Sequence, residues 1–204
     1  MEAGGYVTSV NWHGYAWTSA VGTGSTVAPT DFSSLGSGGQ LCAQGSVAGS
    51  ADEANVAELS ININQAEALA GTAPPIDTYT PTGTGIAYNI ANNGASLLRL
   101  QIQAADGATN AADRWCATIE GGTGTVPWAA FNTECWGVTG GTAYAGQPIA
   151  TVIVQVPGSS VATPFDICIN SITEAGAICG VTSGSSSDGG ADDSGADGTL
   201  GDAS

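Results

Sequence analysis

The chain has 204 residues, enough for one domain with a sizeable core. Only 10% of its residues are charged, and 18 acidic residues against two basic ones give a net charge of -16. This charge disfavours nucleic acid and acidic polysaccharides as partners, because both are polyanions. No apolar run is long enough to cross a bilayer, so we expect no membrane insertion.

Short segments with β-strand character follow one another along the chain. They lie at residues 5–18, 40–47, 58–65, 85–90, 96–103, 113–119, 125–128, 148–156 and 164–172. The turn signal Asn92-Asn93-Gly94 predicts a hairpin. Residues 21–40 read as a loop, and residues 52–57 are the one helix candidate. Repeated short strands of this kind predict a β-sandwich or barrel.

Several strands alternate between two kinds of side chain, which predicts that each kind occupies its own face of the sheet. The expected core residues are Leu59, Ile61, Ile63, Leu98, Leu100 and Ile102. The opposite faces carry amides and one arginine: Asn62, Asn64, Arg99, Gln101, Gln103 and Gln155. In the opening segment, Trp12, Gly14 and Ala16 share one face, and His13, Tyr15 and Trp17 share the other; only one of these faces can be buried.

The five cysteines include no CxxC pair, which favours disulfides over a zinc ribbon or a redox motif. Cys116 and Cys135 flank a compact strand-turn-strand unit, so we pair them. Cys42 and Cys168 lie on an early and a late strand that could be neighbours, and we pair them as well. Cys168 with Cys179 is the alternative; otherwise Cys179 is free or bridges two molecules. Disulfides indicate an oxidising compartment, so we expect a secreted or cell-surface protein.

Residues 181–204 are rich in Gly, Ser and Asp and contain no aromatic residue. Such a segment cannot bury enough apolar area to offset the entropy of ordering it. We therefore expect a β-sandwich domain at residues 1–180, followed by a disordered acidic linker or tail. Weak calcium binding by the Asp-Gly pairs is the disfavoured alternative.

Short motifs in the second half resemble those of a known family. VPWAAF at residues 126–131, CW at 135–136 and FDICINSI at 165–172 are similar to the C-terminal half of galactose-binding-like jelly rolls. The opening NWHGYAWT and the segment RWCA also resemble secreted modules of bacteria. The resemblance spans residues 5–175. It implies an all-β, two-sheet antiparallel sandwich that serves as a non-catalytic carbohydrate-binding module of a secreted bacterial protein.

The resemblance also bears on metal binding. Many such domains hold a structural calcium ion partly through acidic residues of the last strand. Here Asp166 is present, but Asn170 and Ser171 stand where further acids are expected. Asp166 is therefore the one candidate metal ligand; we expect no required cofactor, and a structural calcium ion is left open.

Sugars are bound by aromatic rings that stack on their C–H faces and by planar polar groups that bond their hydroxyls. The candidate ligand-binding residues are Trp17, Tyr15, Asn62, Asn64, Arg99, Gln101, Gln103 and Gln155. The competing interpretations are a solvated β-surface for the amides, edge or core packing for Trp17, and a salt bridge with Glu58 for Arg99. We expect Trp115 in the core, and Trp136 packed on a disulfide unless it is exposed.

Enzymatic chemistry finds little support in the sequence. His13 is the single histidine, and no GxSxG motif accompanies it. Glu58, Asp113, Glu120 and Glu134 lie in no recognisable glycosidase motif. We therefore predict a non-enzymatic protein that binds a neutral polysaccharide and targets a secreted parent protein to it. The alternative is an extracellular structural or adhesive module that self-associates or contacts other surface proteins.

Overall fold

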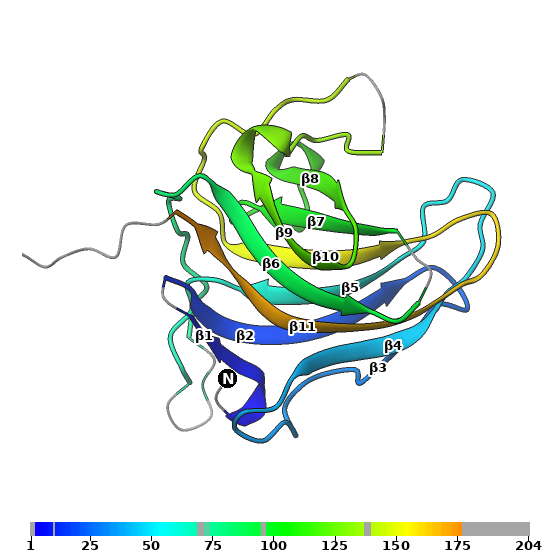
Figure 1. Ribbon diagram of the computed structural model, residues 1–204, viewed down its shortest axis with the longest axis horizontal. Helices are drawn as coiled ribbons and strands as arrows, with labels where there is room; N and C mark the ends of the chain where they lie inside the picture. Colours follow the sequence, from blue (N-terminus) through cyan, green and yellow to red (C-terminus); the bar gives the residue numbers. More distant parts are fainter. Residues whose placement is uncertain are drawn as a thin grey trace, which may run out of the picture.

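The computed structural model describes residues 3–9, 11–68, 72, 74–94, 97–136 and 140–176. Its strands form two antiparallel sheets packed face to face (Figure 1). The first sheet has the order β1-β2-β5-β10-β7-β8, and the second has the order β3-β4-β11-β6-β9. The predicted β-sandwich is thus confirmed. The expected tail at 181–204 and the domain boundary at 180 lie outside the described residues.

The strands of the first sheet are β1 (Tyr6–Thr8), β2 (His13–Val21), β5 (Val56–Asn62), β10 (Thr151–Pro157), β7 (Leu98–Gln103) and β8 (Arg114–Ile119). Those of the second are β3 (Thr26–Ala28), β4 (Leu41–Val47), β11 (Thr163–Ala175), β6 (Gly85–Asn92) and β9 (Gly122–Pro127). In the described residues, helical structure is limited to three short 3-10 turns: η1 (Ala3–Gly5), η2 (Ala111–Asp113) and η3 (Trp128–Ala130).

The strand order identifies the sandwich as a jelly roll. When β4 to β11 are counted as strands 1 to 8, the second sheet contains the order 1-8-3-6 and the first contains 2-7-4-5. This is the order produced when a chain folds as two Greek keys across two sheets. The remaining strands extend the edges, with β1 and β2 next to β5 and β3 next to β4. The jelly roll that the sequence resemblance implies is therefore confirmed.

Alternation along the strands builds the core between the sheets. Leu98, Leu100 and Ile102 of β7 have no exposed surface, and Leu59 of β5 is also completely buried. In β2 the buried face is the one that carries Trp12, which retains only 2% of its surface. The faces assigned from sequence periodicity are therefore the faces observed, because a strand half-buried on one side allows only one register.

Four local expectations were wrong. The hairpin predicted at Asn92-Asn93-Gly94 does not form, because the chain crosses there from β6 in the second sheet to β7 in the first. Asp52 and Glu53 form a turn instead of a helix, and the chain is already extended at Val56, where β5 begins. The long loop at residues 21–40 contains the short strand β3, which pairs with β4. Trp128 begins η3 instead of continuing a strand, because Pro127 directly precedes it and cannot donate the next ladder hydrogen bond.

Both expected disulfides are present in the structure. Cys42 and Cys168 are directly opposite each other on β4 and β11 and are 126 residues apart in sequence. Cys116 and Cys135 are 19 residues apart, with Cα atoms separated by 5.3 Å. The first bond joins neighbouring strands of the second sheet, whereas the second ties a loop onto β8 of the first sheet.

A buried carboxylate fixes the loop before β6 to the end of β11. Glu174 accepts hydrogen bonds from the backbone N–H groups of Thr82 and Gly83, both at 2.6 Å, and from the Tyr79 hydroxyl at 2.6 Å. The side-chain amide of Asn11 donates a fourth bond at 3.3 Å. Burial and the nearby carboxylate raise the pKa of the Tyr79 hydroxyl. Glu174 thus acts as a structural anchor.

Aromatic residues close the sandwich beside this anchor. Phe131 is completely buried, and Trp128 packs on it with ring centroids 5.9 Å apart. The indole N–H of Trp128 donates to the Gly83 carbonyl at 3.0 Å. Tyr144 is buried against Trp115, with centroids 5.2 Å apart. These rings are structural, as expected for Trp115. Among the described residues, no helix is long and apolar enough to span a membrane.

Candidate functional site

The outer face of the first sheet presents side chains in rows that run across the strands. The pairing register places Trp17 of β2 opposite Ser60 of β5, and Ser60 opposite Ile153 of β10. Ile153 is in turn opposite Gln101 of β7, and Gln101 is opposite Cys116 of β8. This row begins at a tryptophan and ends at a disulfide, with one apolar side chain in the middle. Trp17 and Gln101 are three strands apart, or about 14 Å.

A second row lies beside the first and is joined by hydrogen bonds. The Ser19 hydroxyl donates to one oxygen of Glu58 at 2.9 Å, and Gln155 donates to the other at 2.8 Å. The same Gln155 amide also donates to the side-chain oxygen of Gln101 at 3.1 Å. Arg99 follows Gln155 in the register. The chain of bonds fixes the amides before any ligand arrives, which reduces the entropy lost on binding.

Loops rise around these rows and produce a cleft of about 830 Å³. Its floor includes Trp17, Glu58, Ser60, Arg99, Gln101, Gln103, Ile153 and Gln155. Its walls come from the turn at Asp52 and Glu53, from Ala108 and Arg114, and from Trp136. Gln101 and Gln155 are each only 7% exposed although they face outward from the sandwich, so the cleft floor is largely shielded.

Both basic residues of the chain lie in this cleft. Arg99 and Arg114 are its whole complement of Lys and Arg, against 18 acidic residues. Within the described residues neither guanidinium has an ion-pair partner, and the Nε atom of each is buried with no hydrogen-bond partner. Burial lowers the pKa of Arg99, and the negative charge of Glu53 partly opposes this shift. Unpaired, partly buried cations are unfavourable for folding and therefore point to an external partner.

The cleft wall also contains strained backbone. Glu53 has a φ of 53°, and it is the single non-glycine residue with positive φ in the described part of the chain. Positive φ disfavours residues that carry a Cβ, and such residues gather at binding sites. The strain lies in the same turn whose carboxylate interacts with Arg99.

The structure brings five of the eight sequence-predicted binding residues together in the cleft. These are Trp17, Arg99, Gln101, Gln103 and Gln155. The expected alternative for Arg99, a salt bridge with Glu58, does not form, because Glu58 is bonded to Ser19 and Gln155.

The other three predicted residues bond to the loop that follows β5. The Asn62 amide donates to Gln65 at 2.8 Å, and the Asn64 amide donates to the Thr78 carbonyl at 2.8 Å. The Tyr15 hydroxyl accepts from the backbone N–H of Ala68 at 2.9 Å. The loop therefore covers this end of the sheet, and the three side chains are engaged in holding it.

Sequence reasoning left out several residues that line the cleft. Arg114 was not chosen, although it is one of only two basic residues and shares the face of Cys116 on β8. Ser60 and Ile153 are also missing from the predicted binding residues, although each lies on the same strand face as a predicted amide. Trp136 was expected to pack on a disulfide unless it is exposed, and its side chain is 65% exposed. The chain has only two basic residues, and this scarcity was the signal in the sequence that could have identified Arg114.

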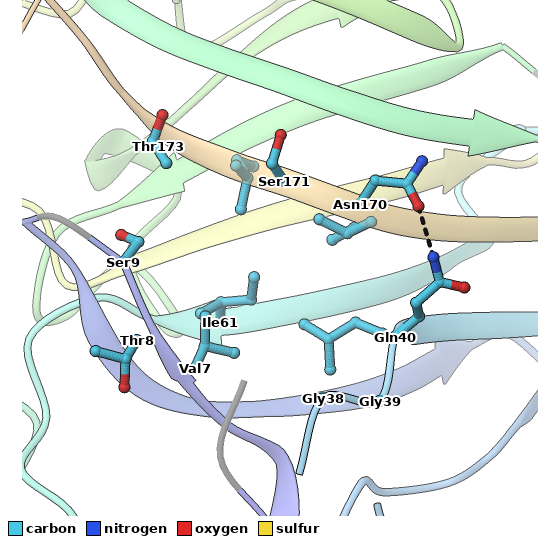
Figure 2. A pocket seen from close by; sticks show the side chains of 13 residues that line it. Val7, Thr8, Ser9, Gly38, Gly39, Gln40, Ile61, Asn170, Ser171 and Thr173 are labelled. Carbon is cyan, nitrogen blue, oxygen red and sulfur yellow. Dashed lines mark hydrogen bonds between the residues drawn. The ribbon is translucent and has the colours of Figure 1, made fainter. Parts of the chain in front are cut away.

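A second, smaller cavity of about 300 Å³ opens between the two sheets, beside the edge strand β1 and against β11 and the start of β4. Figure 2 shows Val7 and Ile61 on one side and β11 on the other, with Gln40 bonded to Asn170 at 3.0 Å. The hydroxyls of Ser171 and Thr173 point away from Ile61. No charged or aromatic residue lines this cavity. Because this cavity is smaller and offers neither an aromatic ring nor a charged group, we take the larger cleft as the candidate site.

Asp166, the candidate metal ligand, takes part in a side-chain hydrogen bond. Asp166 accepts a hydrogen bond from the Asn93 side chain at 3.3 Å. Across the described residues, no three His, Cys, Asp or Glu side chains cluster closely enough to hold a metal ion. Structural calcium bound at Asp166 stays a prediction.

Comparison with solved structures finds similar folds at low sequence identity. A family 11 carbohydrate-binding module of the cellulosomal cellulase Lic26A-Cel5E of Clostridium thermocellum gives a TM-score of 0.49 at 12% identity, covering 87% of this chain and 94% of that one. The structure of PfGH50B gives a TM-score of 0.39 at 12% identity, covering 78% of this chain but 22% of that one. No family model and no curated protein matches the chain. These likenesses concern the fold and do not identify a ligand.

Proposed function

We propose that the protein binds a neutral polysaccharide in the cleft on the outer face of the first sheet, and so targets a secreted parent protein to it. One observation carries this proposal. The two Lys and Arg residues of a chain with net charge -16 both lie in a single cleft, with no ion-pair partner among the described residues, together with Trp17 and a bonded row of glutamines. Aromatic, guanidinium and amide groups together match the C–H faces and hydroxyl pairs of sugars.

The charge of the cleft favours an uncharged ligand. Arg99 and Arg114 are balanced by Asp52, Glu53 and Glu58, so the lining carries a formal charge of +2 − 3 = −1. An anionic ligand would meet these acids and the field of the whole chain, which is strongly negative. Sugar hydroxyls can accept from guanidinium N–H groups of the arginines that line the cleft without bringing a charge of their own.

A binding role is favoured over a catalytic one. Glycoside hydrolysis requires two carboxyl groups free to act across the bound sugar. Glu58, the one acid on the cleft floor, uses its two oxygens to accept bonds from Ser19 and Gln155. The two disulfides support a location outside the cell, where such bonds persist.

Affinity electrophoresis in gels that contain soluble xylan, hydroxyethylcellulose or glucomannan tests the proposal. We expect retardation by at least one of them, and loss of retardation in the Trp17→Ala and Arg99→Ala variants. Gln44→Ala is the matched control, because Gln44 is an exposed amide on β4 of the opposite sheet. Absence of binding across the panel would refute the proposal. Concentration-dependent oligomers in light scattering would then favour the self-associating alternative.

A further inference from the structure

The Cys116–Cys135 disulfide stands on the wall of the cleft. Cys116 is opposite Gln101 in the register, and its side chain points to the outer face of the first sheet. The chain approaches it at Asn132, which exchanges two backbone hydrogen bonds with Cys116 at 2.8 and 3.1 Å. It then turns, and the disulfide draws Cys135 back onto β8. The next residue, Trp136, thereby comes to lie above β7.

Trp136 is poorly accommodated by the fold alone. Its side chain is 65% exposed, and it is the one aromatic among the exposed large apolar residues of the described chain. Its ring lies over the Arg99 guanidinium, with 5.9 Å between the Arg99 Cζ atom and the ring centroid. It lines the cleft on the β7 side, and Trp17 lines it on the β2 side, three strands away. An exposed indole beside an arginine in a cleft is a ready stacking surface.

Two specific interactions tie Cys135 and Trp136 to the sheet in the described part of the chain: the disulfide and the contact with Arg99. A cation–π contact at an exposed site is weak, so it cannot by itself hold a turn in one place. Backbone hydrogen bonds of Asn132 and Thr133 hold the start of this turn, and the disulfide is what holds Cys135, the neighbour of Trp136, on β8. The other disulfide joins β4 to β11 in the opposite sheet and does not touch this turn.

We propose that Trp136 is a second ligand-stacking ring of the cleft, and that the Cys116–Cys135 disulfide is the group that positions it. A single sugar chain would then lie across the strands and contact Trp17 at one side and Trp136 with Arg99 at the other. This inference rests on the proposed function and adds to it the span of the ligand and the role of one disulfide.

Isothermal titration with soluble xylan and with hydroxyethylcellulose tests the ligand contact. We expect Trp136→Ala to weaken binding at least about tenfold, as loss of one stacked ring should. The double variant Cys116→Ala/Cys135→Ala should weaken binding by a similar factor, and adding Trp136→Ala to it should have little further effect. Cys42→Ala/Cys168→Ala, which removes the other disulfide, should keep the wild-type affinity. Full affinity without Cys116 and Cys135, or strictly additive losses, would overturn the inference.

A second measurement needs no ligand. The NMR signals of the Arg99 Nε–H and side-chain methylenes should carry a ring-current shift from Trp136. We expect this shift to vanish in Trp136→Ala and in Cys116→Ala/Cys135→Ala, and to persist when the Cys42–Cys168 bond is removed. If the shift survives loss of Cys116–Cys135, the positioning role is refuted even where binding is observed. If the shift behaves as expected but no polysaccharide binds, the positioning stands and the proposed function fails.

Discussion

Replacing Arg99 by methionine should make the protein more stable while abolishing most of its ligand affinity. The Nε atom of Arg99 is buried without a hydrogen-bond partner, and no carboxylate pairs with the guanidinium in the described residues. An unsatisfied buried polar group costs about 1–3 kcal/mol, and we take about 2 kcal/mol for Arg99 because its Nε atom is itself buried. The cation–π contact with Trp136 offsets about 0.5–1 kcal/mol of this. Methionine keeps much of the side-chain volume, so we expect a net gain of about 1 kcal/mol in the free energy of unfolding.

Urea denaturation at neutral pH measures this gain, and titration with the bound polysaccharide measures the loss. Hydrogen bonds from a charged donor contribute about 1.5–3 kcal/mol, which corresponds to a loss of about tenfold or more in affinity. Gln44→Met, on the exposed face of β4, serves as a control and should change stability by less than about 0.5 kcal/mol. If Arg99→Met destabilises the fold instead, the arginine is a structural residue and the assignment of the cleft loses its main support.

Three further predictions concern the framework. Removing the Cys42–Cys168 disulfide, which closes a loop of 126 residues, should lower the free energy of unfolding by about 5 kcal/mol in the chain-entropy model, as read from urea curves; a loss under about 2 kcal/mol would contradict it. Glu174→Gln should cost about 2–3 kcal/mol, because the remaining oxygen can take the two backbone donors but the amide N–H groups would face the Tyr79 and Asn11 donors that Oε2 now accepts; a neutral change would contradict this role. Burial raises the pKa of Tyr144 to about 12, above its unfolded value near 10, so stability should be complete below pH 10 and fall as the pH rises towards 12. Tyr144→Phe should remove this part of the alkaline loss in denaturation curves at pH 9 and 11, and an unchanged slope would refute the assignment.

Much of the fold could be predicted from local pattern. Alternation in β5 and β7 fixed which residues face the core, since Leu59 and Leu100 can be buried only if Ser60 and Gln101 face outward. The Cys42–Cys168 pair followed from positions on an early and a late expected strand, and the Cys116–Cys135 pair from its place on either side of a short strand-turn-strand segment. The errors arose where turn chemistry competes with propensity, as at Asp52, where a turn precedes β5.

The site was harder to predict because it depends on strand order and on loops. Periodicity placed Trp17 and Gln101 on outward faces, but it could not show that β5 and β10 separate them by three strand spacings. It also could not reveal that Asn62 and Asn64 are engaged by the loop that follows β5. Those contacts join residues 3 and 14 positions apart and depend on where that loop folds.

Mapping the bound ligand by NMR tests whether the polysaccharide binds in the cleft on the outer face of the first sheet. A ¹H–¹⁵N titration with the best-binding member of the neutral polysaccharide panel reports on the side-chain N–H groups of both arginines and of Trp17 and Trp136. We predict that these four signals shift most and saturate together, because their side chains line one cleft. Shifts confined to the cavity between β1 and β11, or no saturable change at the arginine signals, would contradict the assignment of the cleft as the binding site.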